Sequence, residues 1–161
     1  MVKNINLVIT DIDGVWTDGG MYYSEEGVEI KKFNTRDGMG VERLRNNNIE
    51  TIICTSENTN IVKNRAKKLK IKNCFLGIKD KGTFLENFFK KEKIDKKTVA
   101  YIGDDLNDLE IITKVGFSAC PNDAIELIKT KVDYICENMG GKGAFREFAE
   151  LILEYKNGKT N

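Results

Sequence analysis

The chain has 161 residues, and its 26 Lys and Arg against 25 Asp and Glu leave a net charge of +1. This length fits a single domain over residues 1–161, without room for a second large one, and the balanced charge gives no indication of nucleic-acid binding. The sequence contains no histidine, which excludes Ser-His and Cys-His nucleophiles and a histidine-rich zinc site, so acid–base chemistry near neutral pH falls mainly to carboxylates.

Short apolar runs alternate with helical patterns along most of the chain. Runs typical of buried strands occupy residues 6–10, 51–55, 73–76, 98–102 and 116–119. Apolar spacing typical of helices covers residues 38–46, 59–69, 81–93, 106–114, 122–129 and 143–155. Strands that alternate with helices in this way require right-handed crossovers, so we expect an α/β fold with a Rossmann-like, doubly wound parallel sheet.

The segment of residues 19–33 departs from this alternation. Residues 21–23 and 28–30 flank a Ser-Glu-Glu-Gly turn, a pattern typical of a β-hairpin inserted directly after the first strand. Two short strands are not stable alone, so we expect this hairpin flap to cover a functional site or to pair with another subunit.

No stretch of the sequence is typical of a signal peptide or a membrane span, and we expect no membrane partner. The four cysteines, Cys54, Cys74, Cys120 and Cys136, form no C-x-x-C pair, and each lies in or beside an apolar run. We therefore expect buried free thiols and a reducing, cytoplasmic location.

Polar side chains follow several of the predicted strands. Asp11 and Asp13 come directly after the first strand and Thr55 ends the second, while Lys81 opens the helix after the third and residues 104–108 (Asp-Asp-Leu-Asn-Asp) follow the fourth. Because ligands bind at the carboxyl ends of the strands of an open parallel sheet, these residues form a candidate catalytic site.

A lone Asp-x-Asp-Gly segment is commonly a turn or a helix cap, and a Thr ending a strand or a Lys opening a helix is commonly structural. A second acidic cluster changes this interpretation, because two carboxylates about 4 Å apart repel by roughly 4 kcal/mol at an effective dielectric of about 20. A bound cation removes that repulsion, and oxygen ligands that share a phosphate suit Mg²⁺. Thr55 and Lys81 would then hold the oxygens of a transferring phosphoryl group.

Residues 11–18 (Asp-Ile-Asp-Gly-Val-Trp-Thr-Asp), Thr55, Lys81 and residues 103–108 resemble, in order, the four motifs of the haloacid dehalogenase superfamily. The match spans nearly the whole chain. It implies a phosphatase, a phosphoric monoester hydrolase in which Asp11 is the nucleophile that forms an aspartyl-phosphate and Asp13 is the general acid and base. Thr55 and Lys81 would hold the phosphoryl group.

The same resemblance implies a metal site. Asp11, Asp104 and the backbone carbonyl of Asp13 would hold Mg²⁺, and Asp105 and Asp108 would orient these ligands and Lys81.

No insertion is large enough for a cap domain, and the chain resembles the capless branch of the superfamily, whose members hydrolyse eight- and nine-carbon 2-keto-3-deoxy sugar acid phosphates. Residues 33–38 and 140–147 match this branch as well.

The resemblance implies a homotetramer built through the hairpin, in which a neighbour's C-terminal segment, here the glycine-rich turn and helix at residues 138–156, helps close each site. Candidate substrate-binding residues in these segments are Thr35, Asp37, Lys142 and Arg146. The simpler interpretation of the last segment is a flexible turn that leads into a capped helix.

Residues 55–57 (Thr-Ser-Glu) bear on the substrate. Eight-carbon enzymes of the branch usually show Thr-Gly-Arg and nine-carbon enzymes Thr-Gly-Glu, so Glu57 favours a nononate or N-acylneuraminate 9-phosphate. Arg65 would pair with Glu57 or bind the sugar acid. Ser56 departs from both patterns, and the Arg-Asp-Gly at residues 36–38 is typical of the eight-carbon enzymes. The alternative is therefore 3-deoxy-D-manno-octulosonate 8-phosphate, an intermediate of lipopolysaccharide biosynthesis.

Two other classes share part of this inventory. A two-component receiver domain, which is a phospho-switch, also combines an acidic pair, a Thr, a Lys and a phosphorylated Asp, but its acceptor Asp ends a middle strand, and no Asp ends the run 51–55. A catalytically inactive assembly module has no need of the complete acidic set. The sequence therefore predicts a Mg²⁺-dependent phosphatase.

Overall fold

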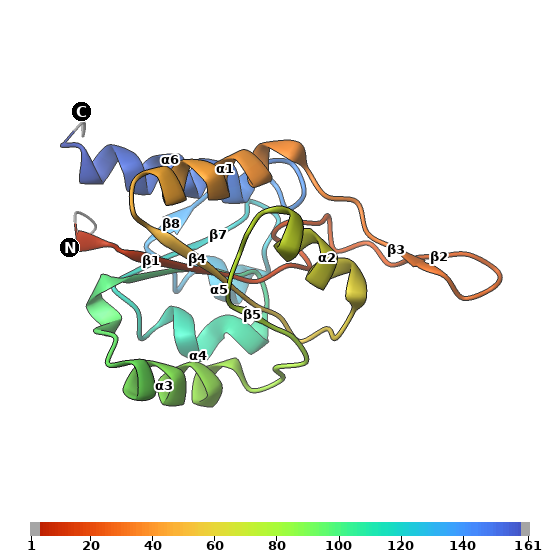
Figure 1. Cartoon of the computed structure of the whole chain (residues 1–161), viewed down its shortest axis with the longest axis horizontal. Helices are drawn as coiled ribbons and strands as arrows, with labels where there is room; N and C mark the ends of the chain where they lie inside the picture. The colour runs from red at the N-terminus through yellow and green to blue at the C-terminus, as the bar shows by residue number, and fades with distance from the viewer. Residues whose placement is uncertain (1–3, 159–161) are drawn as a thin grey trace.

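The computed structural model describes residues 4–158 and is built around a six-stranded sheet in the order β5-β4-β1-β6-β7-β8, in which every neighbouring pair is parallel. Figure 1 shows this sheet between two layers of helices. Its strands are β1 (Leu7–Thr10), β4 (Glu50–Cys54), β5 (Cys74–Phe75), β6 (Val99–Ile102), β7 (Phe117–Cys120) and β8 (Tyr134–Ile135). The doubly wound α/β fold and the five strands expected from the apolar runs are confirmed. Strand β8 was not predicted.

The helices are α1 (Thr35–Asn46), α2 (Asn60–Lys68), α3 (Lys81–Glu92), α4 (Leu109–Ile112), α5 (Glu126–Lys129) and α6 (Ala144–Lys156), with 3₁₀ turns at Lys96–Thr98 and Leu106–Asp108. Local capping explains two of their starts. The side chain of Asn34 accepts from the N–H of Arg36, and that of Asp80 accepts from the N–H of Thr83. The single helix expected over residues 106–114 is instead a 3₁₀ turn followed by the short α4.

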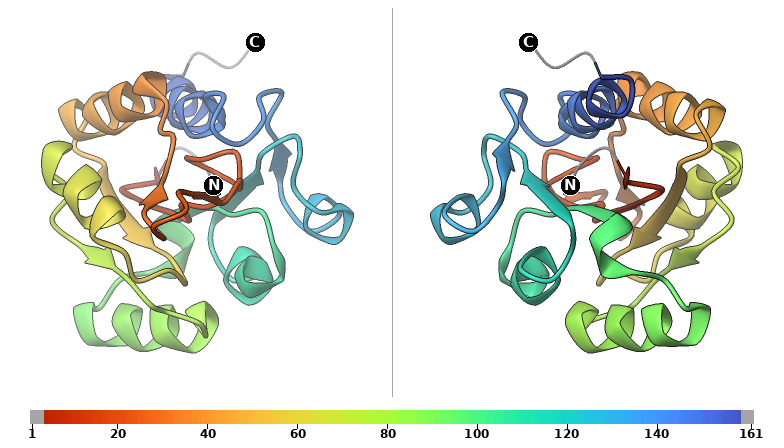
Figure 2. Two further views of the ribbon diagram at one scale, coloured as in Figure 1. Left: turned by 90° about the vertical axis from the view of Figure 1, so that its right-hand side faces the viewer. Right: turned by 90° about the vertical axis from the view of Figure 1, so that its left-hand side faces the viewer.

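Successive residues of the central strands face opposite sides of the sheet, as strand geometry requires. Val8 and Ala100 pack in the cluster under α1, α2 and α6, whereas Ile9 and Tyr101 pack in the cluster under α3, α4 and α5. Figure 2 shows α1 and α6 lying together on one face and α3 on the other. Both faces of the sheet are therefore buried, which leaves its carboxyl edge as the place where polar side chains gather.

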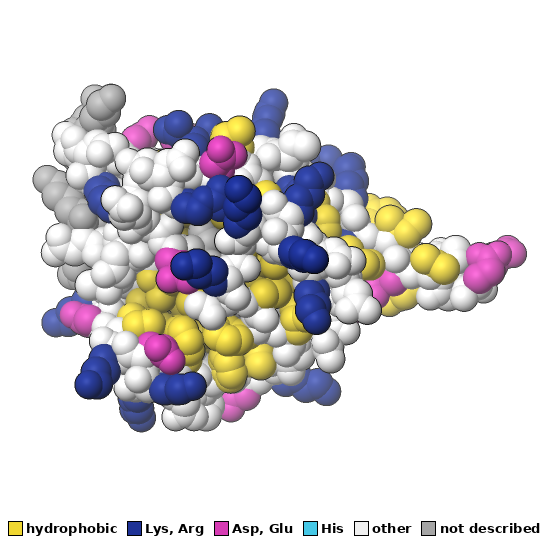
Figure 3. All heavy atoms as spheres, viewed as in Figure 1, with side chains coloured by type: hydrophobic (Ala, Val, Ile, Leu, Met, Phe, Trp, Pro, Cys, Tyr) yellow, Lys and Arg dark blue, Asp and Glu magenta, His cyan; other side chains and the backbone are white. Residues whose placement is uncertain are grey.

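The predicted hairpin is present and projects from the body of the protein (Figure 1). Its strands β2 (Tyr22–Tyr23) and β3 (Glu29–Ile30) are antiparallel and join only each other. Its large apolar side chains are 44–59% exposed, and Figure 3 shows them as a patch behind an acidic tip; they are Met21, Tyr22, Tyr23, Val28 and Ile30. Within residues 4–158 no other segment covers this patch.

All four cysteines are free thiols, and three of them are buried, while Cys74 is partly exposed. None of the helices in the described part of the chain has the length and apolar content needed to cross a bilayer. The cytoplasmic location stays a prediction.

Candidate active site

The register of the sheet brings the candidate residues together. β1 lies between β4 and β6, and Thr10 at its end is paired with both Ile53 and Ile102. The chain leaves β1 for β4 on one side and returns to β6 on the other, so the carboxyl end of β1 is the topological switch point where ligands bind in such folds. Asp11 follows Thr10 directly at this point.

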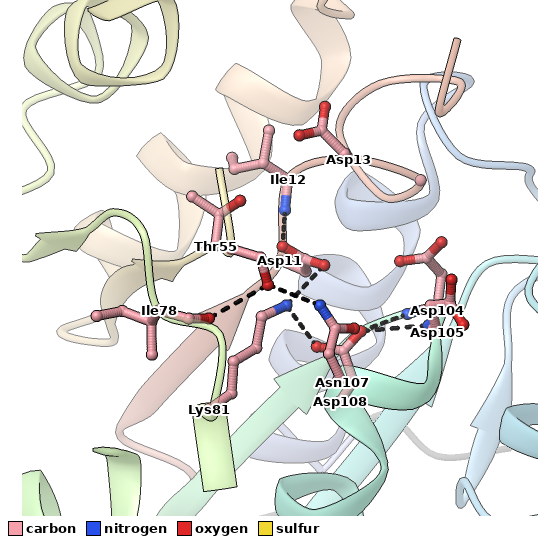
Figure 4. Close-up of polar contacts among 12 residues, drawn as sticks. Asp11, Ile12, Asp13, Thr55, Ile78, Lys81, Asp104, Asp105, Asn107 and Asp108 are labelled. Carbon is pink, nitrogen blue, oxygen red and sulfur yellow. Dashed lines mark hydrogen bonds and ion pairs between the residues drawn. The ribbon is translucent and has the colours of Figure 1, made fainter. Parts of the chain in front are cut away.

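Lys81 connects the acidic residues of this edge. Its Nζ lies 2.7 Å from Oδ2 of Asp11 and 2.7 Å from Oδ1 of Asp108 (Figure 4). Although it opens α3, Lys81 is fully buried rather than solvent-facing. Burial alone lowers the pKa of a lysine, but the charges of Asp11 and Asp108 outweigh it and raise the pKa of Lys81. The ammonium is therefore permanently charged in this site.

Asp108 is held by four donors. Its Oδ1 accepts from Lys81 and from the hydroxyl of Tyr101 at 2.6 Å, and its Oδ2 accepts from the N–H groups of Asp104 and Asp105 at 2.9 and 3.3 Å. Asp108 thus orients Lys81 and the loop that carries Asp104. The side chain of Asp105 is exposed and makes a different contact: it accepts a hydrogen bond from the N–H of Leu106 at 2.6 Å and caps the 3₁₀ turn.

The residues present fit a divalent cation. Carboxylate oxygens of Asp11, Asp104 and Asp108 lie within 4.8 Å of one another, and Oδ1 of Asp104 is buried without a hydrogen-bond partner among the described residues. Each oxygen of Asp108 accepts from two donors, whereas each oxygen of Asp11 has one, the N–H of Ile12 or the ammonium of Lys81. Asp11 and Asp104 therefore have the free acceptor capacity. Gly14 leaves room for Asp104, because a Cβ at residue 14 would lie 1.9 Å from its Oδ2.

Electrostatics also favour a cation here. Burial raises the pKa of Asp11 to about 7 and that of Asp104 to about 8, and the neighbouring carboxylates add to both shifts. When all three carboxylates are ionised, they and the ammonium of Lys81 leave two negative charges, which a divalent ion would neutralise. Hard oxygen ligands of this kind suit Mg²⁺.

Asp13 lies apart from this cluster, and Figure 4 shows its carboxylate turned away from Lys81. Its Oδ1 accepts from Nζ of Lys31 at 2.8 Å and from the hydroxyl of Thr17 at 3.2 Å. Lys31 follows the hairpin strand β3, and the sequence analysis missed it. The available signal was its alternation with Glu29, which places both side chains on one side of the strand.

Thr55 is buried beside Asp11, and its hydroxyl accepts from the N–H of Glu57 at 3.3 Å. The next residue, Ser56, donates to the carbonyl of Ile78 at 3.2 Å and accepts from the side-chain amide of Asn107 at 2.8 Å. Ser56 therefore joins the loops after three strands, and Glu57 is exposed next to it.

Two of the expected substrate-binding residues have structural contacts. Arg65 donates to the carbonyl of Asn34 at 3.2 Å and lies 5.5 Å from the ring centroid of Phe33, instead of pairing with Glu57. Asp37 is fully buried and accepts from the N–H of Arg146 at 3.0 Å, in the first turn of α6. Neither contact involves the carboxylate cluster.

The glycine-rich turn packs against the loop of residues 14–17. A Cβ on Gly140 would lie 2.0 Å from the carbonyl oxygen of Gly14, and the N–H of Gly141 donates to the carbonyl of Val15 at 3.0 Å. The turn therefore supports the backbone that follows Asp13, which sequence reasoning did not predict.

The basic residues of the C-terminal segment lie elsewhere. Lys142 and Arg146 line a groove along α6 together with Arg36, and Arg146 pairs with Glu150 at 2.7 Å. Neither Asp11 nor Lys81 is among the residues that line this groove. Thr35 is exposed at the start of α1.

Comparison with known proteins finds relatives that match nearly the whole chain. A family model described as haloacid dehalogenase-like hydrolase matches residues 76–146. The 3-deoxy-D-manno-octulosonate 8-phosphate phosphatase KdsC of Haemophilus influenzae is 39% identical over 153 residues, which is 95% of this chain and 85% of that protein. KdsC of Salmonella typhimurium is 38% identical over 151 residues, 94% of this chain and 80% of the relative.

Solved structures give the same picture. The 3-deoxy-D-manno-octulosonate 8-phosphate phosphatase of Moraxella catarrhalis, determined with a magnesium ion, a phosphate ion and a KDO molecule, superposes with a TM-score of 0.94 at 39% identity, covering 98% of this chain and 90% of that one. The enzyme of Yersinia pestis gives a TM-score of 0.93 at 36% identity, with 97% and 84% coverage.

An acidic cluster closed by a buried lysine at the carboxyl edge of a doubly wound sheet defines a hydrolase of this kind, and the chain belongs to the haloacid dehalogenase-like family. The relatives named above are all KdsC-type phosphatases. The family resemblance inferred from the four motifs is confirmed.

Proposed function

We propose that this protein is a Mg²⁺-dependent phosphatase that releases phosphate from 3-deoxy-D-manno-octulosonate 8-phosphate, in lipopolysaccharide biosynthesis. The observation that carries the proposal is the buried contact of Lys81 with Asp11 and Asp108. The similarity to KdsC, which extends over nearly the whole chain, supports it. The comparisons support this eight-carbon substrate better than the nine-carbon substrate that Glu57 favoured.

In the first half of the reaction, a carboxylate oxygen of Asp11 attacks phosphorus and the bond from phosphorus to the sugar oxygen breaks. Asp13 gives its proton to the departing sugar oxygen, and Thr55 and Lys81 hold the phosphoryl oxygens. The products are the free sugar acid and an aspartyl-phosphate on Asp11.

In the second half, water attacks the phosphorus of the aspartyl-phosphate while Asp13 takes the proton from the water. Inorganic phosphate leaves, and the Asp11 carboxylate and the Asp13 acid are restored. Asp11, Asp104 and the backbone carbonyl of Asp13 would hold Mg²⁺, and the charge of the ion would offset that of the phosphoryl oxygens. Asp108 keeps Lys81 directed at Asp11.

The test compares kcat/KM for 3-deoxy-D-manno-octulosonate 8-phosphate, ketodeoxynononate 9-phosphate and N-acetylneuraminate 9-phosphate, with phosphate release as the readout. We expect the eight-carbon substrate to be preferred by about 10-fold or more. Turnover should stop with EDTA and in Asp11→Asn. Turnover that survives EDTA would refute the metal-dependent mechanism, and a preference for either nine-carbon substrate would refute the substrate assignment.

The nine-carbon substrate is a second candidate because Glu57 is exposed next to Thr55. The variant Glu57→Arg separates the two candidates. If the eight-carbon substrate is the natural one, Glu57→Arg should raise or preserve kcat/KM for it. If Glu57 determines a nine-carbon specificity, the variant should lose kcat/KM for the nine-carbon substrates alone.

We further propose that the protein assembles as a homotetramer through the hairpin. The supporting observation is the exposed apolar patch on β2 and β3, which is large for a segment that meets only water. Light scattering after size exclusion should show a smaller species for Val28→Glu with Ile30→Glu, and no change for Glu25→Gln at the hairpin tip. A monomeric wild-type protein would contradict this assembly.

A further inference from the structure

Lys31 is the one residue of the hairpin base whose charged group is drawn into the catalytic loop, as far as the described residues show. Its side chain is only 2% exposed, although the apolar side chains of the same hairpin are 44–59% exposed. Its Nζ lies 2.8 Å from Oδ1 of Asp13 and 3.0 Å from Oε1 of Glu29. A lysine whose only role was to make the hairpin surface polar would instead extend its ammonium into water.

The contact leaves the two oxygens of Asp13 in different states. Oδ1 accepts from the ammonium of Lys31 and the hydroxyl of Thr17, whereas Oδ2 is buried without a partner among the described residues. An oxygen that accepts from two such donors has no room for a proton of its own. Oδ2 is therefore the oxygen of Asp13 that remains open to another group.

The backbone beneath Asp13 is already supported from the opposite end of the chain by Gly140 and Gly141. That support acts on main-chain atoms of residues 14–17 and does not touch the Asp13 carboxylate. The direction of this carboxylate is thus left to Lys31 and Thr17, of which Lys31 carries the charge and belongs to the hairpin.

We propose that Lys31 is a positioning residue for Asp13: it holds Oδ1 so that Oδ2 faces the leaving oxygen of the substrate, and it thereby ties the hairpin to the step in which the sugar departs. This inference rests on the proposed phosphatase function. Lys31 itself does not touch the reacting atoms, so it acts on the rate of the step that needs Asp13 and leaves substrate affinity nearly unchanged.

The experiment replaces Lys31 by Met, which keeps the length of the side chain and removes the charge. Two substrates are compared: the sugar phosphate, whose alkoxide leaving group needs a proton, and p-nitrophenyl phosphate, whose leaving group does not. Single-turnover release of the sugar should fall about 10- to 100-fold in Lys31→Met, because a positioned acid contributes at least that much, while the first turnover of p-nitrophenyl phosphate stays within about 3-fold of wild type.

A second signature follows from the return of Asp13 as the base for water. With p-nitrophenyl phosphate, Lys31→Met should show a burst of p-nitrophenol followed by a slower steady state, because the aspartyl-phosphate then accumulates. Lys31→Arg, which keeps a donor and the charge, should regain part of the lost rate. Lys32→Met makes the same chemical change one residue along, on an exposed side chain, and should leave both substrates unaffected.

Equal losses on both substrates, measured on protein with a wild-type thermal unfolding profile, would overturn the inference, and so would an unchanged sugar rate. If Lys31→Met does not fold, Lys31→Gln, which also removes the charge, takes its place, and Lys31→Arg remains the variant that should regain part of the rate. If wild-type protein releases phosphate from neither substrate, the proposed function fails. If the wild-type protein turns over both substrates but Lys31→Met behaves like wild type, only the positioning role of Lys31 is refuted and the proposed function stands.

Discussion

The ammonium of Lys81 lies 2.7 Å from Oδ1 of Asp108, and neither side chain has any exposed surface. Asp108 is bonded to Tyr101 and to two backbone N–H groups as well, so it is a rigid support for the lysine. The second contact of Lys81, at 2.7 Å from Asp11, is therefore directed by Asp108. Mutation can separate what these two contacts of Lys81 contribute to folding stability from what they contribute to activity.

Lys81→Met should destabilise the metal-free protein by about 3–5 kcal/mol, because it leaves buried carboxylates without their cation. Phosphate release should fall about 10²- to 10³-fold, as when one preorganised donor to a reacting group is removed. Urea unfolding and a phosphate assay measure the two effects. The double variant Lys81→Met with Asp108→Asn should recover stability and not activity, and equal stability of the single and double variants would contradict the prediction.

Mg²⁺ should stabilise the wild-type protein, by about 2.7 kcal/mol at a concentration 100-fold above its Kd. Asp104→Asn removes one of the clustered charges, so the metal-free variant should unfold at a higher temperature than wild type and respond much less to Mg²⁺. Thermal unfolding with and without the ion measures both. Asp105→Asn keeps a good helix cap and should retain the full response; a loss there equal to that of Asp104→Asn would show that Asp105 supports the metal ligands after all.

Gly140→Ala should cost about 1–3 kcal/mol of folding stability, since the new methyl group would lie 2.0 Å from the carbonyl oxygen of Gly14 and the backbone must move. The displaced loop directly follows Asp13, so kcat should fall as well. Gly27→Ala is the control: it has open space around it and a φ of +79°, so it should lose about 1 kcal/mol through backbone strain and keep full turnover. Normal turnover in Gly140→Ala would show that the loop does not depend on this contact.

Asp37 should make stability depend on pH. Burial raises its pKa from 3.8 to about 6, against the opposing effect of the Arg146 N–H. Because the folded pKa is the higher one, the contribution of protonated Asp37 is complete below about pH 4 and is lost as the pH rises through about 6, a change of about 2–3 kcal/mol. Asp37→Asn keeps the acceptor for Arg146 and removes the charge.

Urea unfolding between pH 4 and 7.5 tests this prediction. The stability of Asp37→Asn relative to wild type should rise by about 2–3 kcal/mol across that range. The exposed Glu92→Gln serves as a control whose difference from wild type stays constant. Parallel curves for Asp37→Asn and wild type would mean that Asp37 is ionised at no cost in the folded protein.

The alternation of apolar runs and helical patterns was enough to predict the parallel sheet and the edge at which Asp11, Lys81 and Asp104 meet. The reason is that strands which alternate with helices run parallel because of crossover handedness, and a residue just past a parallel strand has only one edge of the sheet to occupy. The absence of histidine and the grouped carboxylates then directed the chemistry to oxygen ligands.

Contacts between distant segments could not be predicted in the same way. The pairing of Lys31 with Asp13, the support of Gly14 by Gly140, and the placement of Asp37 under the first turn of α6 join residues 18, 126 and 109 positions apart. Each depends on how a hairpin, a turn or a helix packs against the sheet, and side-chain periodicity contains no information on that packing. The motifs around Asp11 therefore follow from the order of residues along the chain, whereas the direction of Asp13 follows from the position of the hairpin in space.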